Sequence, residues 1–483
     1  MPLTIGSRSW RLAQAAGLLD FALHSIDPRG GFGWLDEVGH LDPNHPRELW
    51  ISCRMTHVMA IGQLLGHAGC ADGLDHGMAA LAGLFHDDEN GGWFSAVDAS
   101  GAPIDTDKAA YPHAFVILAA ASALAAGHPG GRQLLDQALR VSQQHFWDEV
   151  AGRVVEQWDW RFTQVDPYRG VNANMHSVEA YLAAADALEL TGDQAAAGLW
   201  RGRARRIIDA LIIGNAATNT WRIPEHFDAE WQPLLEYNRD RPDDPFRPYG
   251  ATVGHGLEWA RLCLQADPTN GPGRPDYRQA ALALYQRAIA DGWCVDGADG
   301  FVYTTDWQGQ PVVRQRMHWV LAEAIGASGA LRQAGLISDG SLPMPVSNPG
   351  QESAITTDQE PVDPDDGRAK DDSLPADGGA NVSSVSTDDP NTDSRPPYPP
   401  MTQPGANGTA DLDRWWHYAD HYLIDHERGS WHHELNPNNQ PAATVWQGKP
   451  DVYHALQACL LEDLPRQQGI VTAIARRRAS ALA

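Results

Sequence analysis

The stretch Val171–Ala180 reads Val-Asn-Ala-Asn-Met-His-Ser-Val-Glu-Ala, and apolar residues recur behind it at helical spacing. Asn174 suits the N-cap of this helix, because its side chain can accept a hydrogen bond from a free backbone N–H of the first turn. His176 would then lie in the first turn, where the helix dipole disfavours a protonated imidazole. A neutral imidazole there can accept a proton near pH 7. One such histidine is more often a buried, hydrogen-bonded residue, but His255 and His454 are predicted at the same place on two other helices.

The composition indicates a soluble protein with a large core. The chain has 483 residues, of which 43% are hydrophobic, and its formal net charge is -26. No apolar run reaches the roughly 18 residues of a membrane helix, and the first residues lack the pattern of a signal peptide, so a cytoplasmic protein is expected. The negative charge argues against nucleic acid or an anionic membrane as a partner. Five scattered cysteines without a C-x-x-C pair argue against a disulfide framework and a zinc–cysteine site.

One segment differs in composition from the rest. Residues 338–410 are rich in Pro, Gly, Ser, Asp and Thr and show no apolar periodicity. We expect this segment to be an acidic, disordered surface insertion between two helices, a solvated spacer rather than an interaction arm. Residues 1–337 and 411–483 are then predicted to form a single catalytic domain.

A short turn-rich cluster with an aromatic residue recurs along that domain, and each copy predicts a small β-hairpin. The six clusters are Gly30–Trp34, Asn90–Phe94, Ala151–Val155, Thr218–Trp221, Gly300–Tyr303 and Gly429–Trp431. Twelve helical patterns lie between them, at roughly 7–26, 47–66, 71–85, 109–127, 132–147, 173–192, 194–213, 251–266, 276–291, 313–335, 411–426 and 449–463. Six repeats of two helices predict an all-α fold, an (α/α)6 barrel with short β-hairpins at the helix connections.

The even-numbered helices share a feature that the odd-numbered ones lack. In such a barrel alternate helices run parallel, so the six inner helices present the same end to one mouth. All six even-numbered helices have polar or aromatic residues near their N-terminal ends, which predicts a functional site there. These residues are Trp50, Arg54, Lys108, Tyr111, His113, Asn172, His176, His255, Glu258, His318, Trp319, Glu323, Asp451, Tyr453 and His454.

Three histidines and Arg54 at one mouth suit proton transfer on a neutral polyhydroxylated substrate. Histidine donates and accepts protons near neutral pH, and an arginine can hold the oxygen of a developing enediolate. Glu258 stands three residues after His255, so its carboxylate could orient that imidazole or bind a substrate hydroxyl.

The sequence gives little sign of a metal or a cofactor. Three histidines and Glu258 are a possible ligand set that spacing alone does not exclude. No H-E-x-x-H or comparable pair is present, since residues 432–434 (His-His-Glu) are contiguous and lie beside a predicted hairpin. No glycine-rich loop follows a strand and opens a helix, as a nucleotide site would require. We therefore expect neither a metal nor a cofactor.

Three segments resemble the N-acylglucosamine 2-epimerase superfamily, in its mannose isomerase and sulfoquinovose isomerase branch. They are Asn172–Ala180, Phe246–Trp259 and Gly448–Gln457. The resemblance covers nearly the whole chain except residues 338–410, which depart from the family pattern. It implies an (α/α)6 barrel that interconverts sugars without a cofactor, by proton transfer at C1 and C2, and that is a monomer or a homodimer.

The resemblance also implies roles for individual residues. His176 would help open the pyranose ring, and His454 and His255 would be the acid/base pair around a cis-enediol, with His454 as the base at C2. The other residues would contact the sugar. Arg54, Tyr111, Asn172 and Glu258 would bind hydroxyls, Trp50 and Trp319 would form walls, and Glu434 would join them from the last hairpin.

The position to which the proton returns separates an isomerase from an epimerase. One base acting on one face between C2 and C1 gives an isomerase, whereas two bases on opposite faces of C2 give an epimerase. The motif pattern favours conversion of D-mannose to D-fructose, with D-lyxose to D-xylulose as a second reaction. A sulfoquinovose isomerase and a sugar 2-epimerase remain alternatives. A glycoside hydrolase using Glu258 and Glu434, and a non-catalytic sugar-binding protein, are more distant ones.

Overall fold

The computed structural model describes residues 3–267, 275–337 and 411–482. The chain divides into two compact units, Met1–Pro343 with Thr402–Ala483 and Met344–Met401, and everything below concerns the first. The predictions made for residues 338–410 lie outside the described residues.

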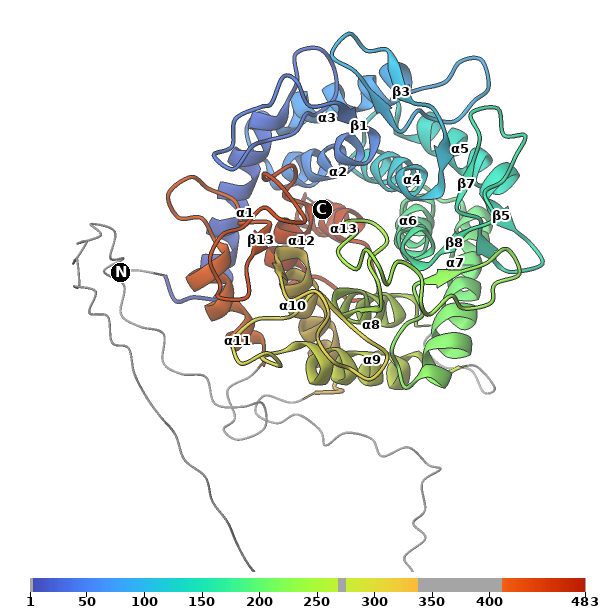
Figure 1. The fold of residues 1–483 in the computed structure, drawn as a ribbon. Coiled ribbons are helices and arrows are strands. Elements are labelled where there is room, and N and C mark those ends of the chain that lie inside the picture. Colours follow the sequence, from blue (N-terminus) through green and yellow to red (C-terminus); the bar gives the residue numbers. More distant parts are fainter. Residues whose placement is uncertain (1–2, 268–274, 338–410, 483) are drawn as a thin grey trace, which may run out of the picture. The chain divides into compact units, whose positions relative to one another are not determined.

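The first unit is an (α/α)6 barrel, as predicted (Figure 1). Six inner helices of the described residues pack side by side in a closed ring, and each of the first five is followed in the chain by an outer helix of the next repeat. The inner helices are α2 (Leu49–Leu65), α4 (Ala110–Ala125), α6 (Val171–Leu190), α8 (Val253–Ala266), α10 (His318–Gln333) and α12 (Tyr453–Leu461). The outer helices are α1 (Arg8–Ala22), α3 (Cys70–Ala79), α5 (Gly131–Val141), α7 (Gln194–Ile208), α9 (Tyr277–Gly292) and α11 (Asp411–Tyr418).

The apolar pattern of the inner and outer helices matches the burial of their residues. In the inner helix α4, 14 of 16 residues are buried, and its sequence is apolar on all sides. In the outer helix α5, only 6 of 11 residues are buried, and they recur at helical spacing on one face. A helix that is hydrophobic all round belongs inside, whereas an amphipathic helix covers a core. The core therefore lies between the two rings.

Short antiparallel strand pairs join successive repeats. The strand that precedes each of the first five inner helices pairs with a strand of the next repeat. These pairs are β1 (Arg47–Glu48) with β2 (Ala96–Val97), β4 (Lys108–Ala109) with β7 (Gln157–Trp158), β8 (Arg169–Gly170) with β9 (His226–Phe227), β10 (Ala251–Thr252) with β11 (Thr304–Thr305), and β12 (Arg316–Met317) with β13 (Glu434–Leu435). Three further strands form two more pairs: β3 (Pro103–Asp105) with β2, and β5 (Trp147–Asp148) with β6 (Arg153–Val154).

This pairing also holds the start of each of the first five inner helices. The first N–H of α6, on Val171, donates to the backbone oxygen of Glu225 at 3.0 Å, and the first N–H of α10, on His318, donates to that of His433 at 3.1 Å. The bond from Lys449 N to Leu35 O, at 2.9 Å, links the last repeat to the first. The neighbouring repeat thus satisfies a backbone donor that a capping side chain would otherwise serve. The inner helices consequently all begin at the same mouth.

Five of the six predicted hairpins are present, each closed by an antiparallel bridge after an outer helix. The prediction for Thr218–Trp221 is wrong. There the chain forms a 3-10 turn, Ala217–Asn219, and Trp221 N donates to Ala216 O at 2.8 Å. Thr220 and Trp221 adopt left-handed φ angles of 54° and 64°, so the backbone turns instead of extending into a strand.

Asn174 is not the N-cap of its helix. α6 begins three residues earlier, at Val171, because the backbone oxygen of Glu225 holds its first N–H. The Asn174 side chain accepts from Val154 N at 2.9 Å and donates to Val154 O at 3.1 Å, so it fastens the preceding hairpin to the helix. His176 therefore lies in the second turn, where the dipole acts more weakly than predicted.

A thirteenth helix, α13 (Ile470–Leu482), was not predicted. It packs on α2, α4, α6 and α12, and Arg478 donates to the last backbone oxygens of α2. α13 thus covers the end of the barrel opposite the mouth. No helix among the described residues is long and apolar enough to cross a membrane.

Candidate active site

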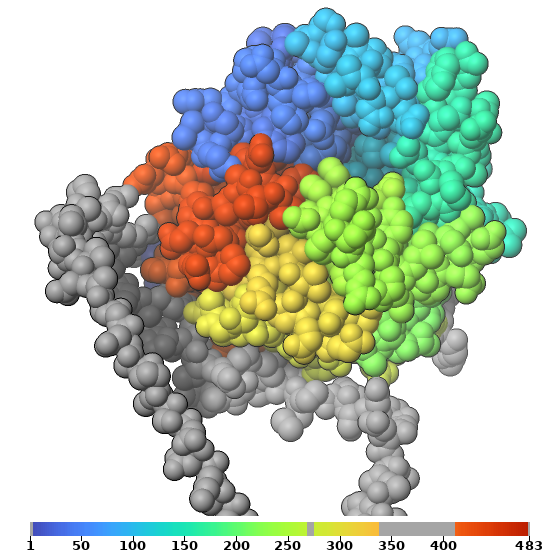
Figure 2. Space-filling view, viewed as in Figure 1, coloured from blue at the N-terminus to red at the C-terminus, as the bar shows by residue number. Residues whose placement is uncertain are grey.

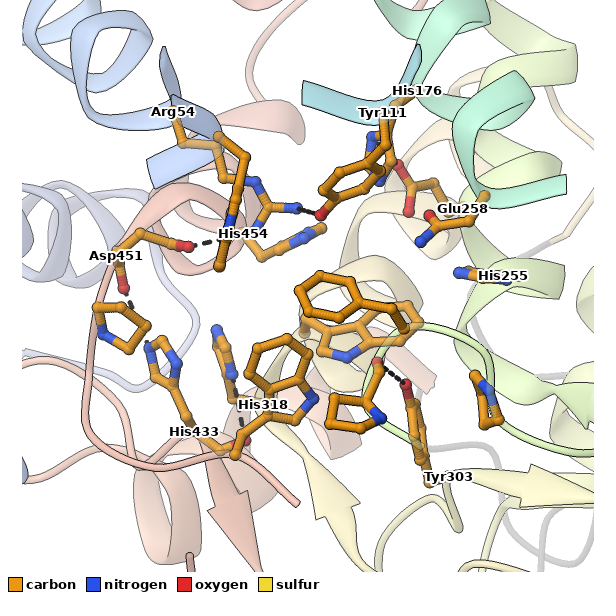
Figure 3. Close-up of a pocket in the computed structure, with 18 residues that line it drawn as sticks. Arg54, Tyr111, His176, His255, Glu258, Tyr303, His318, His433, Asp451 and His454 are labelled. Atoms are coloured by element: carbon orange, nitrogen blue, oxygen red, sulfur yellow. Dashed lines mark hydrogen bonds and ion pairs between the residues drawn. The ribbon is translucent and has the colours of Figure 1, made fainter. Parts of the chain in front are cut away.

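A hollow of about 690 Å³, including its part open to solvent, lies at the mouth where the inner helices begin (Figure 3). Segments of several repeats meet around the barrel axis above it (Figure 2). Nine of the ten predicted site residues line it: Trp50, Arg54, Tyr111, Asn172, His176, His255, Glu258, Trp319 and His454. The leading ends of the alternate helices therefore converge on one space of monosaccharide size.

Each of the three predicted catalytic histidines has a carboxylate behind it. Nδ1 of His454 lies 3.0 Å from Glu323, Nδ1 of His255 lies 2.9 Å from Glu225, and Nδ1 of His176 lies 3.3 Å from Glu179. A carboxylate at Nδ1 favours the tautomer that carries its proton there. Within the described part of the chain, the Nε2 atoms of these histidines have no hydrogen-bond partner. Each is thus available to a ligand.

The structure corrects the expected pairing of His255 with Glu258. Glu225, from the segment between α7 and α8, orients His255, although Glu258 lies on the same helix. Glu258 instead lies 3.9 Å from Nδ1 of His176, and its Oε1 has no hydrogen-bond partner among the residues that the structure describes. Burial, and then the neighbouring carboxylates of Glu323 and Glu179, raise the pKa of Glu258 well above its usual range. A protonated Glu258 can donate a hydrogen bond into the pocket.

Arg54 lies on the opposite side of the pocket from His255 (Figure 3). Its guanidinium bonds Asp451 at 3.1 Å and donates to the Tyr111 hydroxyl at 3.2 Å. It also lies within 5 Å of the ring centres of Phe115 and Tyr453. Burial alone would lower the pKa of Arg54, but the surrounding oxygens more than offset it and raise the pKa. The site thus has one fixed positive charge at its wall.

Two further histidines complete the wall. The rings of His318 and His433 stack with their centres 3.9 Å apart, and Nε2 of His433 bonds the Asp451 backbone oxygen at 3.0 Å. Burial lowers the pKa of His433 to about 4 and holds that of His318 well below its usual range. Burial likewise lowers the pKa of His176 to about 4. These three rings are therefore neutral at pH 7.

Glu434 does not line the pocket. Its carboxylate accepts hydrogen bonds from the Thr444 hydroxyl and from the backbone N–H groups of Val445 and Trp446, at 2.7 and 2.8 Å for the latter two. Glu434 therefore holds the loop that carries Trp446, and Trp446 lines the pocket. This position does not support the expected contact between Glu434 and a sugar.

Several residues at the site had not been given a role. Glu179 stands three residues after His176, and the same helical spacing rule used for His255 could have found it. His318, Glu323 and Asp451 had been noted only as residues at helix starts. The remaining ones come from the segments between helices, and none had been given a role, although Phe246, Pro248 and Pro450 lie within the segments that resemble the family. They are Glu225, Pro245, Phe246, Pro248, Tyr303, His433, Trp446 and Pro450.

The side chains of His176, Glu179 and Glu258 offer three potential metal ligand atoms within 4.8 Å of one another. The guanidinium of Arg261 lies 3.5 Å from Glu258 and 3.9 Å from Glu179. It already supplies positive charge at that place and would repel a bound cation.

Comparison with known proteins agrees with this geometry. The sequence model described as N-acylglucosamine 2-epimerase (GlcNAc 2-epimerase) matches residues 30–336 and 403–458. The chain belongs to the N-acylglucosamine 2-epimerase family. Within it, the chain is 42% identical over 470 residues to a D-mannose isomerase of Thermobifida fusca, covering 97% of each chain. It is 37% identical over 475 residues to a D-mannose isomerase of Pseudomonas cannabina pv. alisalensis, covering 96% of this chain and 95% of the other.

A solved structure extends the comparison from the sequence of this chain to its fold. The crystal structure of a D-mannose isomerase superposes with a TM-score of 0.75 and 23% identity, covering 96% of this chain and 99% of the other. The (α/α)6 barrel is therefore shared by the whole domain and not only by the three motifs.

Proposed function

We propose that the protein is a cofactor-independent aldose–ketose isomerase that converts D-mannose to D-fructose, and D-lyxose to D-xylulose as a second reaction. One observation carries the reaction type: three imidazoles, each with a carboxylate at Nδ1, surround one sugar-sized hollow. The choice of mannose rests on the two relatives that match nearly the full length. The proposed steps use residues of a single chain, and we propose that the protein acts as a monomer or a homodimer.

The first step of the proposed reaction opens the sugar ring. His176 and Glu258 lie on the same side of the pocket (Figure 3). Neutral His176 can accept the proton of the C1 hydroxyl through Nε2, and a protonated Glu258 can donate to the ring oxygen. The C1–O5 bond then breaks and leaves an open-chain aldehyde. Tyr111 and Asn172 would bind the remaining hydroxyls.

The second step moves the C2 proton. His454 would remove it through Nε2, and the negative charge that develops on O1 would be held by Arg54. His255 would take the O2 proton and give it to O1, because its Nε2 is free while Glu225 fixes Nδ1. Return of the C2 proton from His454 to C1 then gives the ketose, so no proton is gained or lost overall. Trp319 lies between these two imidazoles, with ring centres 5.8 and 5.5 Å away, and would form the wall.

The pocket chemistry favours a neutral sugar over a sulfonated one. Arg54 is the single guanidinium among the described lining residues, and it is already paired with Asp451. A sulfonate would require a cation of its own.

A panel of free monosaccharides, assayed by NMR with and without a chelator, tests this proposal. We expect D-fructose from D-mannose and D-xylulose from D-lyxose, with equal rates in both buffers. D-Glucose as the first product from mannose, release of reducing ends from a disaccharide, loss of activity with chelator, or binding of every sugar without turnover would contradict it.

A further inference from the structure

Arg261 lies behind the floor of the pocket and does not line it. It projects from α8, and only 5% of its surface is exposed. Its guanidinium faces three buried carboxylates from three helices: Glu323 at 2.9 Å, Glu258 at 3.5 Å and Glu179 at 3.9 Å. The Arg261 guanidinium therefore lies close to three potential anions.

Two of these carboxylates connect Arg261 to the proposed catalytic histidines. Glu323 uses Oε2 for Arg261 and Oε1 for Nδ1 of His454. Glu179 places Oε1 toward Arg261 and Oε2 toward Nδ1 of His176. Each carboxylate thus stands between the guanidinium and one imidazole.

The charges of this cluster depend on Arg261. Burial alone would raise the pKa of Glu323, but Arg261 and His454 more than offset it and hold the pKa below its usual range. For Glu179, burial acts in the same direction and is offset mainly by His176 and Arg261, so its pKa is also lowered. A buried carboxylate without a counter-charge would take up a proton instead.

We propose that Arg261 is a positioning residue that keeps Glu179 and Glu323 ionised and thereby holds His176 and His454 with the proton on Nδ1 and Nε2 free for the sugar. Without Arg261 the two carboxyl groups would take up protons and donate to Nδ1, and the imidazole proton would move to Nε2. The base at C2 would then have no lone pair facing its substrate. This inference rests on the proposed function, because it assigns those histidines a proton-transfer role.

Arg261→Gln, assayed with D-mannose across pH, is the first test. Loss of the buried positive charge favours protonation of every neighbouring group, so the acid limb of kcat/KM should move up by about one pH unit or more. We expect kcat to fall about 10- to 100-fold, as for removal of groups that orient an imidazole. The groups that face Glu179 and Glu323 are Arg261 and Glu258 from α8, His176 from α6, Tyr453 and His454 from α12, and His57 from α2, while Arg54 from α2 acts on Glu258 and His176.

Arg203→Gln is the matched control, because Arg203 is similarly buried but packs on Trp147 and Trp200, outside the pocket. Its pH profile should equal that of the wild type. An unchanged acid limb in Arg261→Gln, with kcat lost in both variants, would overturn the proposal. If Arg261→Gln does not fold, Arg261→Lys keeps the charge but cannot span the three carboxylates, and it should show an intermediate kcat.

Chemical rescue distinguishes the effect of the Arg261 charge from the effect of its side-chain volume. Arg261 also lines a second hollow, of about 460 Å³ with its open part, on the far side of the floor, together with His57 and Gln457. Arg261→Ala should therefore admit a small cation. Guanidinium at millimolar concentration should restore part of kcat, whereas urea, its uncharged analogue, should not. Equal rescue by both, or rescue by neither, would contradict a charge-based role.

A last measurement needs no substrate. Histidine-selective ¹⁵N NMR reports the tautomer of each ring, and His176 and His454 should carry the proton on Nδ1 in the wild type and shift toward Nε2–H in Arg261→Gln. The same tautomer in both proteins would overturn the inference. If the wild type shows no turnover of mannose while the tautomer shift is present, the proposed function fails and the role of Arg261 in fixing the histidines stands.

Discussion

His454→Ala is expected to lower kcat for D-mannose by about 10²–10⁴, which is the usual contribution of a positioned acid/base group. His454 lines the pocket, and Glu323 fixes its Nδ1, so alanine removes the proposed C2 base. The Glu323 carboxylate stays buried and keeps its bond to Arg261. NMR of fructose formation gives kcat. Sugar binding should persist, because the proposed hydroxyl contacts come from other residues.

His40→Ala serves as the control for this variant. The His40 side chain is 81% exposed on a surface turn, so its removal should leave kcat unchanged. Wild-type turnover in His454→Ala would show that His454 is not the base. A protein without turnover in either form would instead favour the non-catalytic sugar-binding alternative.

Arg54→Met is expected to lower the free energy of unfolding by about 3–5 kcal/mol, because it leaves the Asp451 carboxylate buried without its partner. Methionine keeps apolar contacts with Phe115 and Tyr453, so lost packing contributes little. The same variant should lower kcat by about 10²–10³, the effect of removing a group that holds a developing oxyanion. Urea unfolding followed by circular dichroism and the NMR assay measure the two effects.

The double variant Arg54→Met/Asp451→Asn separates stability from catalysis. Removing both charges should recover much of the unfolding free energy, because no buried carboxylate is left unpaired. It should not recover kcat, since no cation would then face the sugar. Wild-type turnover in the double variant would mean that Arg54 acts only on stability.

The architecture could be predicted because its signals are local. The spacing of apolar residues predicts which helices are buried on all sides, as α4 is, and which on one face, as α5 is. The repeated turn clusters divide the chain into its repeats. The convergence of the histidines followed from the parallel inner helices alone. The hairpin wrongly predicted at Thr218–Trp221 is also a local matter. Thr220 and Trp221 adopt a left-handed backbone conformation there, which their residue types do not predict.

Most partners of the site residues could not be predicted, because they come from other helices or from the segments between helices. Spacing along α8 favoured Glu258 as the partner of His255, yet Glu225 is brought closer by the strand pair β8–β9. Asn174 has a capping residue type, but a backbone oxygen from the next repeat replaces it at the helix start. Glu434 has a functional residue type and is used to hold a loop. Contacts across the ring decide these roles, and no sequence spacing encodes them.

Conversion of unlabelled D-mannose in heavy water tests most directly whether these imidazoles move the C2 proton to C1. Exchange of an imidazole proton with the solvent during the transfer should place deuterium at C1 of the first-formed D-fructose, as read by NMR at low conversion. D-Glucose as the first product, or deuterium bound to a carbon of the first-formed fructose other than C1, would contradict proton transfer between C2 and C1 at this pocket.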